Sequence, residues 1–126
     1  MLKQKGTIKM NINQMISQYV ETAFWTDEEK LEKYNDISGE VYLQAFNDCN
    51  MLIDLISSDS TLTIDTNILD QYGHDFWLTR NGHSVGFLDR PEIYGEYESE
   101  RLEQLVNENF MNSYLYVGDD KLVYLE

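Results

Sequence analysis

Apolar residues near the start of the chain recur at the spacing of an α-helix, and this spacing restricts the possible folds more than any other feature. From Ile12 to Phe24 they occupy positions i, i+3, i+4 and i+7, so they share one face of a helix. Asn11 can cap this helix, because its side chain can accept a hydrogen bond from a free N–H of the first turn. We therefore predict a helix from residue 12 that buries one face.

Four later segments also have helical patterns. The charged segment 26–36 predicts a short helix, since its acids precede its lysines. A short helix capped by Asp65 should end at Gly73, in the left-handed position that follows many helices. Another is expected over 97–109, with Leu102, Leu105, Val106 and Phe110 facing inward. The longest should begin after Ser38, with an apolar face made of Val41, Ala45, Cys49, Leu52, Ile53 and Ile56, and with Phe46 beside it.

The pattern changes to period two between residues 74 and 90. The sequence HDFWLTRNGHSVGFLDR predicts a β-hairpin, because Asn81-Gly82 is the strongest two-residue signal for a type I′ turn. In the register that this turn sets, His74 faces Asp89 across the two strands.

The C-terminal sequence YLYVGDDKLVYLE predicts a second hairpin, which turns at Asp119-Asp120. Helices followed by two hairpins are typical of an α+β fold, with an antiparallel sheet of about four strands covered by helices. We expect a flexible basic tail over 1–11 and a single α+β domain over 12–126.

Negative charge is concentrated after residue 33. The chain has 23 acidic residues against 9 lysines and arginines, a formal net charge of −14. Residues 1–33 are balanced, so the excess falls on 34–126, where 18 acids accompany only Arg80, Arg90, Arg101 and Lys121. Acids in the cation-free stretch before Arg80 have no basic neighbours in the sequence, so this region should project a negative field.

This charge excludes several classes of protein. A nucleic-acid binder needs a basic stripe, and an anionic membrane surface would repel the chain. No segment approaches the roughly 20 apolar residues of a membrane span, and MLKQKGTIKM lacks the apolar run of a signal peptide. We expect a cytoplasmic protein that contacts neither nucleic acid nor membrane directly. The single cysteine, Cys49, agrees with a reducing compartment, and we interpret it as a core residue.

Several residues of the first predicted hairpin are of types that enzymes use. His74, Asp89 and Arg90 could serve acid–base or phosphate chemistry. In the predicted register His74 and His83 lie roughly 20 Å apart, too far to share a metal ion. We favour His74 as a hydrogen-bonded partner of Asp89, and Arg80 and Arg90 as cations that tie acidic segments to the sheet. We expect no catalytic centre, cofactor or metal; a small nucleotide-acting enzyme is the third hypothesis.

Segment 73–90, GHDFWLTRNGHSVGFLDR, resembles a family of small acidic proteins of bacteriophages and other mobile elements, whose members read close to GHDFWLTRNGHGAGFWDR. The similarity includes YVETAFWT at 19–26, DCNMLIDLI in the long helix and the terminal YVGDD, and it spans 12–126. The chain departs from the family at Leu88, where an aromatic residue is usual, and before Lys121, where a glycine is missing. The resemblance implies phage or prophage origin and action in the bacterial cytoplasm, and it implies no particular reaction.

The leading hypothesis is a phage-encoded inhibitor that binds a host nucleic-acid-handling protein by imitating nucleic acid. Defence systems, such as a CRISPR effector or a restriction enzyme, are the expected targets. A globule of this length has a radius of gyration of about 14 Å, so a face spans roughly 30–35 Å. Duplex DNA carries roughly 20 charges over that length, the same order as the excess here. The acids expected to contact the partner are Asp48, Asp54, Asp59, Asp65, Asp70, Asp75, Glu96 and Glu98.

The alternative hypothesis is a protein-interaction module that uses the first hairpin. In this interpretation Trp77, Arg80, His83 and Arg90 contact a host protein, and the acids only confer solubility. The sequence leaves open the identity of the partner and the oligomeric state.

Overall fold

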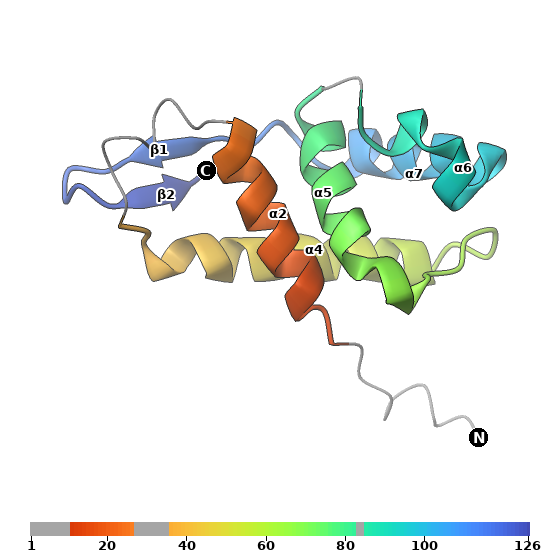
Figure 1. The fold of residues 1–126 in the computed structure, drawn as a ribbon, viewed down its shortest axis with the longest axis horizontal. Helices are drawn as coiled ribbons and strands as arrows, with labels where there is room; N and C mark the ends of the chain where they lie inside the picture. Colours follow the sequence, from red (N-terminus) through yellow and green to blue (C-terminus); the bar gives the residue numbers. More distant parts are fainter. Residues whose placement is uncertain (1–10, 27–35, 83–84) are drawn as a thin grey trace.

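The computed structural model describes residues 11–26, 36–82 and 85–126, and this part of the chain is mostly helical (Figure 1). Its α-helices are α2 (Asn13–Thr26), α4 (Gly39–Ser57), α5 (Leu69–Arg80), α6 (Pro91–Tyr94) and α7 (Glu96–Asn109). Two short 3-10 helices, η1 (Thr66–Ile68) and η2 (Phe87–Asp89), and two strands, β1 (Leu115–Val117) and β2 (Val123–Leu125), complete it. The predicted antiparallel sheet of about four strands is wrong, because the described residues form one two-stranded antiparallel sheet.

The two long helices predicted from apolar spacing are confirmed. Asn11 caps α2, since its side-chain oxygen accepts from the Asn13 N–H at 3.0 Å. Ser38 caps α4 in the same way, with its hydroxyl accepting from the Glu40 N–H at 3.1 Å. The six residues of the predicted α4 face are buried, and Phe46 beside them is half exposed. Of the short helix predicted over 26–36, residues 27–35 lie outside the described part.

The predictions for the C-terminal third are confirmed as well. Helix α7 buries Leu102, Leu105 and Val106, as its spacing indicated, and also Ser99, whose hydroxyl has no hydrogen-bond partner within the described residues. Strands β1 and β2 pair antiparallel with Tyr116 opposite Tyr124. The turn between them contains Asp119 and Asp120, as predicted.

The predicted first hairpin is wrong: its first strand is the C-terminal two-thirds of helix α5. Residues 72, 73 and 75–79 are all buried, so α5 has no single apolar face. The alternation of apolar and polar residues in this segment therefore does not indicate a strand. Asn81 follows the last helical residue, and Gly82 adopts a left-handed φ of 76°. The Asn-Gly pair therefore ends a helix. Left-handed glycine is favoured both just after a helix and in a hairpin turn, so the pair does not distinguish the two.

Gly73 lies inside α5, not after it as predicted, and it allows α5 to approach α2 closely. A Cβ at this position would lie 2.2 Å from the Met15 carbonyl oxygen and 3.0 Å from the Tyr19 nitrogen, both main-chain atoms of α2. Any larger residue would push the two helices apart. Glycine, unfavourable in a helix interior by propensity, is here required by packing.

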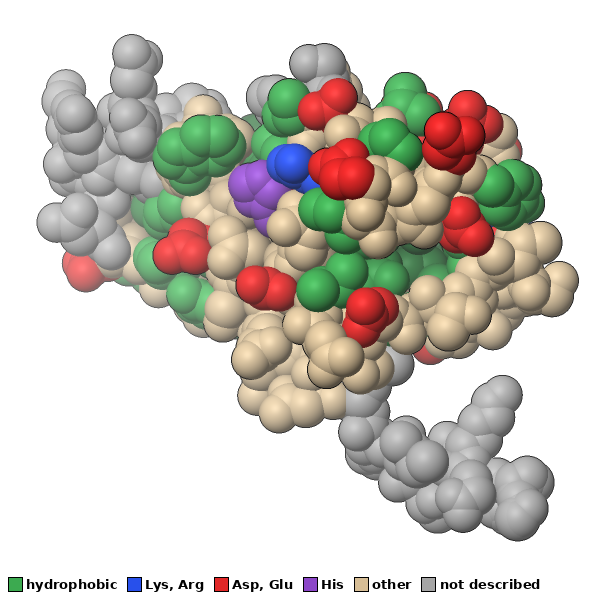
Figure 2. Space-filling view, turned by 45° about the vertical axis from the view of Figure 1, so that its right-hand side comes forward, with side chains coloured by type: hydrophobic (Ala, Val, Ile, Leu, Met, Phe, Trp, Pro, Cys, Tyr) green, Lys and Arg blue, Asp and Glu red, His purple; other side chains and the backbone are tan. Residues whose placement is uncertain are grey.

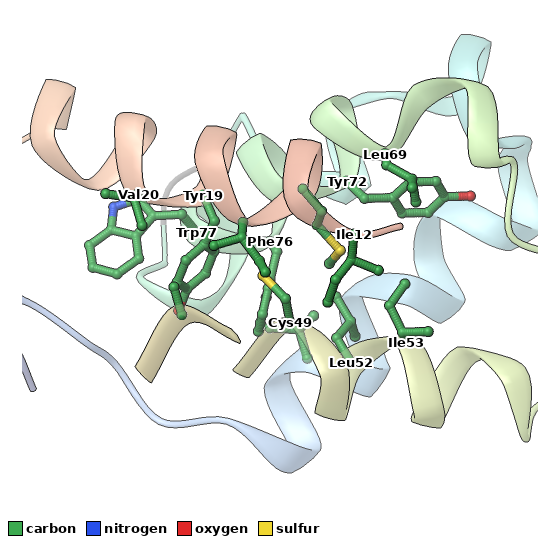
Figure 3. Close-up of a cluster of buried hydrophobic side chains, with 14 of the residues drawn as sticks. Ile12, Tyr19, Val20, Cys49, Leu52, Ile53, Leu69, Tyr72, Phe76 and Trp77 are labelled. Atoms are coloured by element: carbon green, nitrogen blue, oxygen red, sulfur yellow. The ribbon is translucent and has the colours of Figure 1, made fainter. Parts of the chain in front are cut away.

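A single apolar core joins the helices. Helix α2 packs along α5 and against α4, and α7 covers the other side of α4 and α5. Figure 3 shows Tyr19 and Val20 of α2 beside Phe76 and Trp77 of α5, above Cys49 of α4. The Tyr19 ring lies 4.9 Å from the Phe76 ring and meets Trp77 edge to face at 5.4 Å. This packing fixes α5, and with it Trp77 and Arg80, which the hairpin hypothesis assigned to a surface.

Candidate protein-binding surface

Each arginine of the chain forms an ion pair with one of the acids predicted to contact a partner. Arg80 pairs with Asp48 at 2.9 Å, Arg90 with Asp75 at 2.9 Å and Arg101 with Asp59 at 2.7 Å. The three carboxylates come from the stretch between Lys33 and Arg80 that has no basic residue of its own. The fold therefore supplies the cations that the local sequence lacks.

The Arg80–Asp48 pair joins α5 to α4 below the protein surface. The Arg80 side chain is 9% exposed, and it donates to Asp48 at 2.9 Å, to the Tyr19 hydroxyl at 2.8 Å and to the Met111 carbonyl. The guanidinium also lies 5.3 Å from the centre of the Phe110 ring. Burial raises the pKa of the Tyr19 hydroxyl well above its usual value, so this hydroxyl stays a donor to Asp48. Asp48 and Arg80 therefore hold the core together and are not free to bind a partner.

Asp75 is completely buried, although it was expected on the surface. Its two oxygens accept from Arg90 at 2.9 Å, from the Tyr94 hydroxyl at 2.8 Å and from Gln71 at 3.0 Å. Burial and the adjacent carboxylate raise the pKa of Tyr94, which keeps its proton on the hydroxyl and directed at Asp75. The network ties the segment around α6 to α5. A buried carboxylate with three donors is satisfied internally, so it has no role at a surface.

The Arg101–Asp59 pair links α7 to the turn after α4. Asp59 also accepts two hydrogen bonds from Thr61, through its backbone N–H and its hydroxyl. The hydrogen bonds from Thr61 and Arg101 lower the pKa of the Asp59 carboxyl to about 2. Asp59 therefore stabilises the turn as an anion.

Five of the eight predicted contact acids remain available: Asp54, Asp65, Asp70 and Glu96 are exposed, and Glu98 is half exposed. They belong to the C-terminal half of α4, the segment through η1 to the start of α5, and the start of α7. These segments lie together at one end of the molecule, on the right of Figure 1. Exposed Glu92 of α6 joins them, a residue that the sequence did not single out. We call these six residues the acidic end.

Figure 2 turns this end toward the viewer. Red carboxylates are spread over the face, whereas blue appears only in one small area beside the purple histidine. With all three arginines paired, Lys121, in the turn between β1 and β2, is the one other cation of the described residues. The acidic end therefore presents carboxylates that no neighbouring lysine neutralises in the described part of the chain.

Two of the residues assigned to hairpin-mediated binding, Trp77 and Arg80, are not exposed on a surface. Trp77 is 2% exposed, and its ring N–H donates to the Thr26 hydroxyl at 3.0 Å. Arg80 and Arg90 form ion pairs with Asp48 and Asp75. They therefore link acidic segments of the chain as expected, but they link them to helices and not to a sheet. His83 lies outside the described residues.

His74 does not pair with Asp89, since His74 lies in helix α5 and Asp89 in the 3-10 helix η2. Its Nδ1 lies 3.0 Å from the Thr22 hydroxyl, which itself donates to the Gln18 carbonyl. Thr22 must therefore accept from His74, which leaves Nε2 unprotonated in the neutral ring. His74 and Arg90 share a shallow polar hollow of about 290 Å³, but Asp89 does not line it. The three residues proposed for a nucleotide enzyme are thus not assembled into one site.

No group of three or more potential metal ligands occurs among the described residues. Cys49 is fully buried, and burial raises the pKa of its thiol, as expected of a core residue. None of the helices in the described ranges has the length and apolar character to cross a lipid bilayer.

The acidic end also contains a partly enclosed hollow. It has a volume of about 460 Å³ and lies between the end of α4, the segment 62–65, α6 and α7. Ile56, Leu62, Tyr72, Ile93 and Leu102 are among the apolar residues of its wall, and Asp65 and Glu98 supply the charged groups. The hollow combines an apolar wall with negative charge.

Comparisons with protein-family models, with curated proteins and with solved structures find no match to this chain. The site therefore has to be interpreted from its own chemistry.

Proposed function

We propose that the protein is an acidic inhibitor that binds a nucleic-acid-handling protein by occupying its nucleic-acid groove. One observation supports this most: all three arginines are paired with carboxylates of the fold, while no cation of the described residues neutralises the carboxylates of the acidic end. Typical protein surfaces carry charges of both signs interspersed, and the acidic end does not. Unpaired carboxylates complement a basic groove and accelerate association with it.

The spacing of carboxylates on α7 supports the same proposal. Glu96, Glu100 and Glu103 occur at i, i+4 and i+7, so they lie along one side of the helix, next to its buried face. A helix rises about 1.5 Å per residue, so these charges recur roughly every 5 Å. DNA carries one charge per roughly 3.4 Å along each strand. The helix presents a charge density of the same order as one strand.

The class of target follows from the family resemblance of segment 73–90. A phage or prophage product acts in the bacterial cytoplasm, where its basic targets are host enzymes that bind nucleic acid. A defence complex, a CRISPR effector or a restriction enzyme, is the proposed partner. The protein has no catalytic role in this proposal, and it contacts neither DNA, RNA nor membrane itself.

The test is affinity purification from the bacterial host, followed by measurement of binding with two charge-matched variants. Asp54→Asn/Asp70→Asn/Glu96→Gln removes three exposed carboxylates from the acidic end. Asp36→Asn/Glu40→Gln/Asp119→Asn removes three exposed carboxylates elsewhere and gives the same net charge. We expect the first variant to bind about tenfold more weakly and the second to change affinity less than about threefold.

Salt provides the second measurement. Affinity of the unaltered protein should fall steeply as salt is raised, because the contacts are between exposed charges. A partner that binds no nucleic acid, equal effects of the two variants, or an affinity independent of salt would each contradict the proposal.

A further inference from the structure

We infer that the hollow at the acidic end receives an aromatic side chain of the partner that is flanked by lysine or arginine. This inference rests on the proposed function for the basic character of the partner, and it adds where the partner is anchored and by which chemistry. It follows from the wall of the hollow, its charge and the free backbone beside it.

The wall is preformed, and it combines apolar side chains with polar surface. Ile56, Leu62 and Leu102 are buried residues of the core whose side chains also reach the hollow, and Tyr72 closes it from α5. Ile93 is 40% exposed at its edge. The volume of about 460 Å³ falls within the range of roughly 300–1,000 Å³ for binding pockets. Figure 2 shows apolar side chains exposed between the red carboxylates near the middle of this face. An aromatic group would gain by leaving water for this wall.

The charge of the hollow selects a cationic neighbour for that group. Asp65 and Glu98 line it, and no lysine or arginine does. One oxygen of Asp65 accepts from the Asn67 N–H at 3.0 Å, and the other has no partner among the described residues. A lysine or arginine next to the inserted side chain would meet these carboxylates, whereas an acidic neighbour would be repelled.

The segment along one side of the hollow can hold the backbone of a ligand. Leu62 and Asp65 use their N–H groups within the fold, bonding to the Asp59 carbonyl and the Tyr72 hydroxyl. The N–H groups of Thr63 and Ile64 between them make no hydrogen bond to the described residues. An extended peptide can therefore bond to this segment while its side chain fills the hollow.

The test is a methyl NMR titration with three short peptides. The probe is acetyl-Gly-Lys-Trp-Lys-Gly amide, and its matched controls replace both lysines by glutamate or the tryptophan by serine. We expect saturable ring-current shifts at the methyl groups of Ile56, Ile64 and Ile93, and none at Ile37, which lies beside β2. The glutamate peptide should bind at least tenfold more weakly, and the serine peptide should leave these methyl groups unshifted.

Two variants locate the binding. Thr63→Trp places a bulky ring in the hollow from an exposed position and should abolish the shifts, whereas Ser60→Trp, exposed nearby but outside the wall, should preserve them. Asp65→Asn/Glu98→Gln should weaken the probe about threefold to tenfold. Absence of shifts, equal binding of the glutamate peptide, or unchanged binding to Thr63→Trp would overturn the inference.

The outcome for the hollow is separable from the outcome for the proposed function. If the peptide fails while neutralising the acidic end still weakens the purified partner, the anchor is wrong and the proposed function stands. If the peptide binds as expected while the charge variants leave partner binding unchanged, the hollow is a peptide site and the proposed function is wrong.

Discussion

Replacement of Gly73 by alanine tests the central feature of the fold, the close crossing of α2 and α5. The added Cβ would lie 2.2 Å from the Met15 carbonyl oxygen, whereas carbon and oxygen atoms in contact lie roughly 3.5 Å apart. The helices would have to separate by about 1 Å, and a gap of that size forfeits up to about half of the dispersion energy of each contact that it opens. Because the obstacle is main chain, no rotamer change can relieve it.

The expected net effect is a loss of about 2–4 kcal/mol in the free energy of unfolding. Overpacking costs about 1–3 kcal/mol and occasionally more, and a rigid main-chain obstacle places Gly73→Ala at or above the upper limit. Alanine has the better helix propensity by about 1 kcal/mol, which offsets part of the cost. Urea denaturation followed by far-UV circular dichroism gives the value, and the midpoint should fall by about 1–2 M.

Two other glycines calibrate this measurement. Gly39 begins α4 and has open space where a Cβ would be, so Gly39→Ala should be neutral or stabilising by up to about 1 kcal/mol. Gly82 has open space but a φ of +76°, so Gly82→Ala should cost only the left-handed strain, about 1–2 kcal/mol. A Gly73→Ala protein as stable as the unaltered protein, or less affected than Gly82→Ala, would refute the crossing of α2 and α5 described here.

Three further predictions concern individual polar groups. Arg90→Met leaves the fully buried Asp75 without its ion partner and should cost about 3–5 kcal/mol, whereas Arg101→Met removes a more exposed pair and should cost much less; equal losses in urea denaturation would contradict this. Asp59 has a pKa of about 2 in the folded state against roughly 3.9 unfolded, so its contribution is complete above about pH 4 and is lost as the pH falls toward 2. Asp59→Asn should therefore flatten the acid sensitivity in that interval, and a variant with unchanged sensitivity would show that Asp59 is not responsible. Ser99→Ala removes a buried hydroxyl without a partner in the described residues and should raise the thermal midpoint; a lowered midpoint would mean that the hydroxyl is satisfied.

Where an element buries one face, its sequence pattern predicted it. The caps at Asn11 and Ser38, the apolar face of α4 and the inward residues of α7 agree with the structure because each helix meets the core on one side. Helix α5 lies between α2, α7 and the segment around η2, so nearly all its sides are buried. Periodicity cannot be seen in a helix without an exposed face, and the apparent alternation around Trp77 led to the wrong hairpin.

The sequence alone determined the size of the negative charge, its concentration after residue 33 and the scarcity of cations there. It also determined the one-sided helices and the C-terminal hairpin, because those depend on residues close together in the chain. Only the tertiary structure decided which carboxylates are available. Arg80 reaches Asp48 and Arg101 reaches Asp59 across 32 and 42 residues, distances at which no local pattern carries information. An ion pair depends on how distant segments pack, so the acids that looked equivalent in the sequence divide into those paired with arginines of the fold and those of the exposed acidic end.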